Sequence, residues 1–364
     1  MHHTEAEFTQ TDPPLSVEEL ALAFRNRGMP LEAMRYPITP TGLHYLLIHW
    51  DIPETDDPGW HVDVGGAVDR PARLSMDDIR AMPAKTITVT MECAGNGRAR
   101  LDPRPAGQPW LHEAIGTARW TGAPLRDVLS AAGLRNDAVE IVFTGADRGY
   151  QGDVLQDYQR SLRIADAMRP EVLLAYEMNG RPLEPQHGFP VRLLVPGWYG
   201  MTSVKWLRTI EVVTQPFDGF QQAEAYRMQP DADTDGPRVE RMEPRALMIP
   251  PGITDYPYRR RAVEAGGVVV RGRAWSGRGA VERVEVGIDG AWKDAALEDP
   301  VGEFAWRGWT FAWEATPGEH VLACRATDAT GTTQPESQPW NAQGMSNNLI
   351  QTVAVTVVEP GSMA

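Results

Sequence analysis

The sequence is poor in cysteine, in long apolar runs and in positive charge. Only Cys93 and Cys324 occur among 364 residues, which excludes the disulfide framework of a small secreted domain. No stretch approaches the roughly 18 apolar residues of a membrane-spanning helix. Lys and Arg number 35 against 49 Asp and Glu, a formal net charge of -14, so nucleic acid and anionic membranes are unfavourable partners. An anion site therefore requires a local cluster of basic residues.

The N-terminal region carries no signal for export and no motif for haem. Residues 1–14 lack a basic stretch followed by an apolar one, which predicts a cytoplasmic protein, although a mature periplasmic form would show the same features. No Cys-x-x-Cys-His motif occurs, and a haem domain would not fit before residue 40. We therefore expect a haem-free protein.

The first two thirds of the chain mix strand-like and helix-like patterns, which is typical of an α+β domain. Short apolar or β-branched runs predict strands, and apolar residues at helical spacing predict helices, with Pro and Gly between them. The predicted strands cover residues 44–50, 86–91, 138–145, 190–195 and 208–213, and the predicted helices cover residues 17–28, 123–134 and 162–169.

A change in composition predicts a second domain. Residues 228–236 are polar and rich in Asp and Pro, so we place the domain boundary there, with a first domain at 1–237 and a second at 238–364. Beyond it, strand-like runs recur at regular spacing with almost no helical periodicity, which predicts an immunoglobulin-like β-sandwich. These runs cover residues 267–275, 281–289, 309–315, 320–329 and 350–358.

One segment places a cysteine between a strand and a glycine-rich turn. In residues 86–98, TITVTMECAGNGR, a β-branched strand leads directly into Cys93, and a Gly-Asn-Gly turn ends at Arg98. Glycines let the backbone fold closely around a bulky group. Three interpretations are open: a buried structural cysteine, a nucleophile, or a soft thiolate ligand for a metal, which Arg98 would help to deprotonate.

A second segment combines basic residues with a glycine-rich turn. Residues 187–207, HGFPVRLLVPGWYGMTSVKWL, contain His187, Arg192, Ser203 and Lys205. Arginine, lysine and turn amides together can hold a phosphate, because charge-assisted donors converge on its oxygens. The alternative is that the arginine and the lysine belong to a solvated face of two strands.

Together these segments resemble the sulfite oxidase family of molybdenum enzymes. The similar stretches are ECAGNGR, ARWTGAPLRDVL, the 35 residues at 173–207, and, in the second domain, RGRAWSG and QPESQPWNAQG. The resemblance implies a molybdopterin-binding α+β domain followed by an immunoglobulin-like dimerisation domain, a molybdenum–molybdopterin cofactor without haem, and a homodimer. It also implies two-electron oxygen-atom transfer of the sulfite oxidase or sulfite dehydrogenase kind, with electrons exchanged with an external acceptor or donor.

The resemblance also implies roles for individual residues. Cys93 would be the protein ligand of the metal, Arg98 and Trp120 would border the substrate pocket, and Tyr226 would lie beside the oxygen that is transferred. The implied cofactor-binding residues are Tyr45, Leu46, Leu47, Ile48 and His49, largely through their backbone, together with Cys93, Asp147, His187, Arg192, Ser203, Val204 and Lys205.

One position departs from the family pattern. Leu47 stands where the sulfite-oxidising members carry an arginine that reaches the substrate anion, and Arg307 is the nearest candidate for a second pocket arginine. Loss of a guanidinium removes donors that could bind an oxyanion at two points. Two other functions are therefore open: the same cofactor with a different substrate, such as reduction of an S- or N-oxide, and a protein that binds molybdopterin without turnover.

Overall fold

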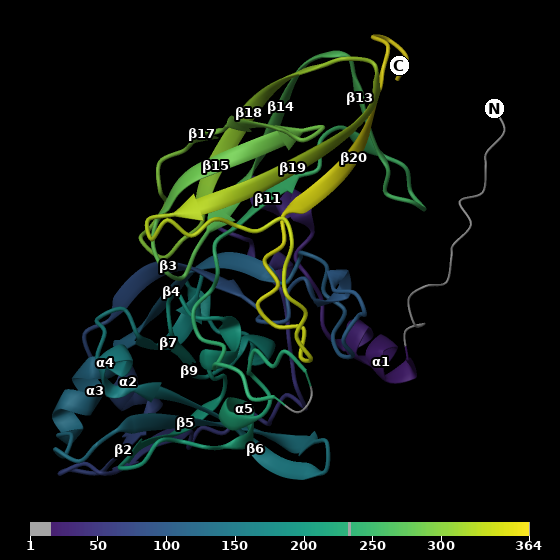
Figure 1. Ribbon diagram of the computed structural model, residues 1–364. Coiled ribbons are helices and arrows are strands. Elements are labelled where there is room, and N and C mark those ends of the chain that lie inside the picture. Colours follow the sequence, from purple (N-terminus) through teal and green to yellow (C-terminus); the bar gives the residue numbers. More distant parts are fainter. Residues whose placement is uncertain (1–15, 232–233, 364) are drawn as a thin grey trace.

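The computed structural model describes residues 16–231 and 234–363 of the chain (Figure 1). Residues 1–14, on which the expectation about localisation depends, lie outside this range. Within it, no helix has the length and apolar character needed to span a membrane. The chain forms a first domain of mixed strands and helices and a second of strands alone, drawn at opposite ends of Figure 1.

The first domain contains two sheets. One has the strand order β2-β1-β10-β5-β6, in which β1 and β10 run parallel and the other pairs are antiparallel. The other has the order β3-β4-β7-β8, and β9 pairs with β7. The strands are β1 (His61–Gly66), β2 (Ala72–Ser75), β3 (Lys85–Glu92), β4 (Ile115–Pro124), β5 (Glu140–Gln151), β6 (Val154–Arg163), β7 (Leu173–Met178), β8 (Arg181–Pro182), β9 (Arg192–Leu194) and β10 (Leu207–Val213).

Short helices complete this domain: α1 (Val17–Arg25), α2 (Met76–Ala81), α3 (Leu125–Ala132), α4 (Ile164–Ala167) and α5 (Phe220–Ala223). The side chain of Ser16 accepts a hydrogen bond from the Glu19 amide and the Glu19 carboxylate accepts one from the Ser16 amide, so a capping box starts α1. The predicted helix at residues 17–28 is thus confirmed, but it ends at Arg25.

Two sequence expectations for this domain are wrong. Residues 44–50 form no strand, and only Leu46 makes an isolated bridge, to Arg27. Their backbone bonds side chains instead: the Ile48 amide donates to the Asn26 amide oxygen, and the Leu47 carbonyl accepts from Lys205 Nζ. Of the predicted helix at 162–169, only α4 is helical, because β6 continues to Arg163.

The second domain is a β-sandwich, as predicted. One sheet has the order β11-β14-β18-β17 and the other the order β12-β13-β20-β19-β15-β16. A core that includes Trp309, Trp313 and Cys324 lies between them. The strands are β11 (Arg245–Ile249), β12 (Ile253–Thr254), β13 (Arg261–Glu264), β14 (Gly266–Trp275), β15 (Val281–Ile288), β16 (Ala291–Asp294), β17 (Ala296–Leu297), β18 (Arg307–Ala315), β19 (Gly318–Asp328) and β20 (Gln351–Val358).

The two domains share buried side chains. Met29 and Met34 of the first domain pack in one apolar cluster with Leu247, Trp275 and Trp306 of the second. The segment between β19 and β20, yellow in Figure 1, leaves the sandwich and reaches down to the first domain. The boundary after residue 237 stays a prediction, and the first strand of the sandwich begins eight residues later, at Arg245.

Candidate functional site

Cys93 lies directly after β3, on a turn that its own glycines make possible. Its amide donates to the Ala114 carbonyl at 2.9 Å, and Gly97 has a φ of 92°, a conformation that favours glycine. Only 6% of Cys93 is exposed. Burial raises the pKa of the thiol, while the Arg98 charge and N–H groups of Gly95 and Trp110 act in the opposite direction. Cys93 and Cys324 are both free and buried.

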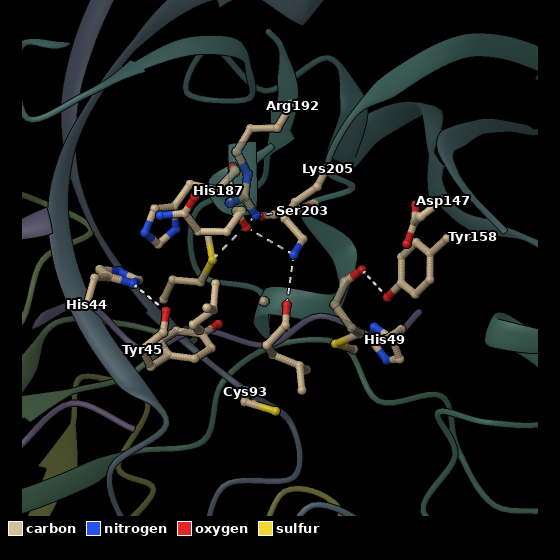
Figure 2. A pocket seen from close by; sticks show the side chains of 16 residues that line it. His44, Tyr45, His49, Cys93, Asp147, Tyr158, His187, Arg192, Ser203 and Lys205 are labelled. Carbon is tan, nitrogen blue, oxygen red and sulfur yellow. Dashed lines mark hydrogen bonds between the residues drawn. The ribbon is translucent and has the colours of Figure 1, made fainter. Parts of the chain in front are cut away.

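The thiol lines a cavity, named here the inner cavity, that brings together distant parts of the first domain. Figure 2 shows Cys93 at the lower edge of this cavity and the basic side chains Arg192 and Lys205 above it. The inner cavity is lined by His44, Tyr45, Leu46, Leu47, His49, Met91, Cys93, Asp147, Tyr158, Gln186, His187, Arg192, Gly200, Met201, Ser203 and Lys205.

Two cations of the inner cavity, the buried Arg192 and the partly buried Lys205, form no ion pair with a described carboxylate. Arg192 donates to the carbonyls of His187 (3.0 Å) and Ser203 (2.8 Å), and Lys205 Nζ donates to the Leu47 carbonyl (2.8 Å). Within residues 16–231 and 234–363, no carboxylate comes within ion-pairing distance of either side chain. Unpaired buried charge is costly, so this arrangement is built for an anion.

Burial controls the protonation of the groups around these cations. It lowers the pKa of Arg192 to about 10 and also lowers that of Lys205, whose nearby Asp147 carboxyl has a raised pKa because it too is buried. Burial lowers the pKa of His44 to about 4 and that of His187 to about 2. Both imidazoles are therefore neutral at pH 7, and a bound anion would favour the charged form of Lys205.

A second cavity, named here the outer cavity, shares Cys93 with the inner one. It has a volume of about 380 Å³. Its lining is mainly apolar or neutral: Leu22, Asn26, Leu47, Ile48, His49, Trp50, Cys93, Gly95, Arg98, Ala106, Gly107, Gln108, Trp110, Tyr150, Gln151, Ala225, Tyr226, Gln343 and Met345. Burial lowers the pKa of His49 to about 4, so Arg98 is the one cationic side chain of this lining at neutral pH.

The polar groups of the outer cavity are held in place by neighbours. Arg98 donates from Nε to the Gln343 carbonyl and from Nη1 to the Gln108 carbonyl, both at 3.0 Å. The Tyr226 hydroxyl lies 2.8 Å from His49 Nε2. Burial raises the pKa of Tyr226, so its phenol keeps its proton at neutral pH. The site thus offers one fixed cation and one protonated hydroxyl beside the thiol.

Most of the predicted site residues line one of these cavities. Tyr45, Leu46, Leu47, His49, Cys93, Asp147, His187, Arg192, Ser203 and Lys205 line the inner cavity, and Ile48, Arg98 and Tyr226 line the outer one. Val204 lines neither. Its side chain packs in the core of the first domain, and its backbone carbonyl accepts from the Leu193 amide.

Two predicted pocket residues lie elsewhere. Trp120 is fully buried in β4, edge-on to His44 and beneath Arg192, so it supports the basic end of the inner cavity rather than bordering the outer one. The tryptophan that lines the outer cavity is Trp110. Arg307 donates to the carbonyls of Glu298 and Val281 within the sandwich and lines neither cavity.

Several lining residues were not anticipated from the sequence. Asn26 donates to the Gln108 side chain at 3.0 Å across the outer cavity's wall, and Gln343 and Met345 come from the segment between β19 and β20. Trp110 has an indole N–H without an oxygen or nitrogen partner among the described residues. Asn26, Trp110 and Met345 belong to none of the stretches that resemble the family, and Gln343 lies in one of them, QPESQPWNAQG, without having been assigned a role; all four meet only in space.

Family comparisons match both domains. The family described as the oxidoreductase molybdopterin binding domain matches residues 49–221, and the Mo-co oxidoreductase dimerisation domain matches residues 253–358. The chain is 37% identical over 346 residues to the mitochondrial sulfite oxidase of Rattus norvegicus, covering 88% of this chain and 62% of that protein. It is 34% identical over 354 residues to the NADH nitrate reductase 1 of Oryza sativa subsp. japonica, covering 89% and 38%.

The fold comparison covers almost the whole chain. The sulfane dehydrogenase SoxCD of Paracoccus pantotrophus superposes with a TM-score of 0.79 at 24% identity, covering 98% of this chain and 96% of that one. At this identity the likeness concerns the fold. The chain spans about 62% of the length of the mitochondrial sulfite oxidases that it matches and a smaller share of the nitrate reductases.

Proposed function

The chain belongs to the sulfite oxidase family of molybdopterin oxidoreductases, and from this membership we propose that it catalyses two-electron oxygen-atom transfer at a molybdenum bound by Cys93. One observation carries the proposal. A single cavity has a free thiol at one end and, at the other, the buried Arg192 and the partly buried Lys205, neither of them ion-paired to a carboxylate of the described residues. A cofactor with a phosphate at one end and a thiophilic metal at the other matches this polarity.

The residues present fit a molybdopterin. Arg192 and Lys205 would hold its phosphate, and Asp147 Oδ1, buried without a hydrogen-bond partner among the described residues, is a ready acceptor for N–H groups of the pterin. Cys93 would supply a thiolate. Among the described residues, no group of three or more His, Cys, Asp and Glu side chains could hold a metal by itself. A metal at Cys93 would therefore share its ligands with the pterin dithiolene.

When bound, the molybdenum cofactor supplies a centre that exchanges an oxygen atom and two electrons with a substrate. The side chains of the protein would orient the substrate and donate hydrogen bonds to it. The guanidinium of Arg98 faces the outer cavity as a fixed positive charge. The Tyr226 hydroxyl can donate a hydrogen bond to a substrate oxygen, and its contact with His49 Nε2 at 2.8 Å holds that hydroxyl in position. Electrons then pass to or from an external partner.

The proposal is tested on the purified chain from a host supplied with molybdate. We expect close to one molybdenum per chain by mass spectrometry of the metal, and oxidation or reduction of at least one small substrate with artificial electron acceptors or donors. A protein that takes up no molybdenum contradicts the proposal. A protein that takes up molybdenum but turns over nothing supports cofactor binding without catalysis, which the outer cavity beside Cys93 argues against.

For the substrate, we propose a neutral S- or N-oxide as the second candidate beside sulfite. The outer cavity has one cationic side chain, and two of its guanidinium nitrogens, Nε and Nη1, already donate to backbone carbonyls. Its apolar lining, with Leu47 and Trp110, suits an organic substituent better than a bare oxyanion. The acidic chain, with a net charge of -14, also opposes the approach of an anion.

The effect of residue 47 on the KM for sulfite distinguishes between these two substrates. If sulfite is oxidised, we expect a high KM that rises with added chloride or sulfate, and Leu47→Arg should lower it. One charge-assisted hydrogen bond contributes about 1.5–3 kcal/mol, or roughly ten- to a hundred-fold in affinity. Leu43→Arg adds the same charge nearby at a position that lines neither cavity, so it should leave the KM unchanged. A wild-type KM for sulfite in the low micromolar range would contradict this reasoning.

We also propose a homodimer formed through the second domain, because residues 253–358 match a dimerisation domain. The exposed apolar side chains of Ile253, Tyr256 and Tyr258, between 61% and 92% exposed, lie in this region. Twofold assembly is the commonest closed arrangement. Multi-angle light scattering at micromolar concentration should give about twice the chain mass of 40.3 kDa. A species of the single-chain mass alone would contradict it.

A further inference from the structure

A buried ion pair between the two domains lies directly behind the cysteine turn. Glu92 precedes Cys93, and its carboxylate accepts from Arg245 Nη1 at 2.6 Å and from Asn96 at 2.9 Å. The second carboxylate oxygen accepts from the Trp275 indole N–H at 2.8 Å. Glu92, Asn96 and Arg245 are each 1% exposed and Trp275 is 2% exposed. None of these four residues lines the inner or the outer cavity.

The second domain supplies these partners from one place in its sheet. Arg245 begins β11 and is directly opposite Trp275, the last residue of β14, in an antiparallel pair. Opposed residues project from the same face of a sheet, so the guanidinium and the indole reach the Glu92 carboxylate together. Because β11 and β14 belong to the sandwich, these contacts couple the position of the second domain to the position of the cysteine turn.

A loop of the second domain holds the same turn from another side. The Ser346 amide donates to the Ala94 carbonyl at 2.7 Å, and the Asn347 side chain donates to the Gly97 carbonyl at 2.6 Å. The Arg98 guanidinium donates to the Gln343 carbonyl. Residues 92–98 are thus bonded to the sandwich and its loop along most of their length, while Cys93 lines both cavities.

We propose that the Glu92–Arg245 pair, held by Trp275, positions the Cys93 thiolate and sets the electrostatic potential at the metal which that thiolate binds. The second domain is then part of the metal site in addition to its part in assembly. The inference rests on the proposed function, because it takes Cys93 as the metal ligand. Charges in a dry interior are screened less by solvent and salt than charges at the surface, so the removal of one charge here acts more strongly on its neighbour. Groups behind a ligand commonly tune the bound metal in this way.

Charge variants of opposite sign test the proposal. Glu92→Gln removes a negative charge of nearly the same shape, so the molybdenum midpoint potentials should rise. Arg245→Gln removes the positive charge, so they should fall. Trp275→Phe removes one donor from the carboxylate without changing the formal charge and should lower the potentials less than Arg245→Gln does. A general loosening of the fold would not order the shifts by the sign of the charge removed, so this pattern distinguishes electrostatics from a structural role.

Matched controls come from the sandwich. Arg325 and Glu285 form a comparable pair between β19 and β15, with contacts of 2.8 and 3.1 Å, and neither lines a cavity. Glu285→Gln and Arg325→Gln should leave the midpoint potentials and the Mo(V) electron paramagnetic resonance spectrum unchanged. Potentials that do not move in Glu92→Gln and Arg245→Gln, or that move in the same direction, would overturn the electrostatic part of the proposal.

A readout that needs no metal tests the positioning part. We expect the amides of residues 93–98 to exchange hydrogen for deuterium faster in Arg245→Gln than in the wild type, and at the wild-type rate in Arg325→Gln. Unchanged exchange in Arg245→Gln would overturn the positioning role whether or not metal is bound. A wild-type protein without molybdenum would contradict the proposed function instead, and the exchange rates would still decide the role of Arg245.

Discussion

Replacement of Cys93 by serine is expected to abolish turnover while leaving the fold and the bound pterin in place. A hydroxyl is a hard, poorly ionised ligand, whereas the thiolate is soft and donates strongly to the metal. Loss of an outer partner of a metal ligand already costs roughly 10- to 100-fold in affinity or activity, so loss of the ligand itself should exceed this range. The measurements are turnover with an artificial acceptor, pterin content, and circular dichroism of the purified variant.

Cys324→Ser is the matched control. Cys324 is fully buried in the sandwich core and lines neither cavity, so its replacement should lower thermal stability modestly and leave turnover intact. If Cys93→Ser retained wild-type turnover, or if both variants lost activity to the same extent, Cys93 would not be the metal ligand.

Replacement of Lys205 by methionine is expected to weaken cofactor binding while stabilising the cofactor-free protein. A lost charge-assisted bond to the phosphate costs about 1.5–3 kcal/mol, or roughly ten- to a hundred-fold in affinity. Without the phosphate, Lys205 is a partly buried cation that forms no ion pair with a described carboxylate, and its loss of hydration opposes folding. Pterin content after extensive dialysis should therefore fall, and the melting temperature of the cofactor-free protein should rise.

The pH dependence of the free energy of unfolding tests the role of Lys205 independently. Burial places the pKa of Lys205 in the folded, cofactor-free protein well below its usual value. Between these two pKa values the unfolded chain binds more protons than the folded one, so stability contributed by this group rises as pH rises through the range. Lys205→Met should remove that rise. Arg119→Met, at an exposed position of β4, should change neither cofactor content nor this pH profile. A stripped Lys205→Met protein that is less stable than the wild type would contradict the assignment.

Much of the fold was predictable because local patterns agreed with the final packing. The β-branched run before Cys93 became β3, and the five strand-like runs of the second domain became the main strands of the sandwich. Alternation of apolar residues specifies a strand wherever one face is buried. The same reasoning failed at residues 44–50, because their apolar side chains surround a cavity and their backbone bonds Asn26 and Lys205 instead of a neighbouring strand.

The candidate site was predictable to the extent that its residues belong to contiguous motifs. Cys93, Arg192 and Lys205 sit in stretches that resemble the sulfite oxidase family, and the structure places all three at the inner cavity. The two tryptophans show the limit of such reasoning. Trp120 belongs to a recognisable stretch but is buried beneath Arg192, whereas Trp110 lies in an unremarkable loop and lines the outer cavity. Direction of a side chain depends on the strand that carries it and on its neighbours, which spacing along the chain does not specify.

By itself, the sequence determined the family, the two kinds of domain, and the residue types that a phosphate and a soft metal require, because each of these is recorded in a continuous run of residues. Tertiary structure alone decided that Leu47 and Cys93 border both cavities, that Arg98 is the one cation of the outer cavity, and that Arg245 and Trp275 hold Glu92 behind the thiol. The two contacts of Glu92 join residues 153 and 183 positions apart along the chain. Contact energies act through space, so only the packing of the two domains brings such residues within hydrogen-bonding distance.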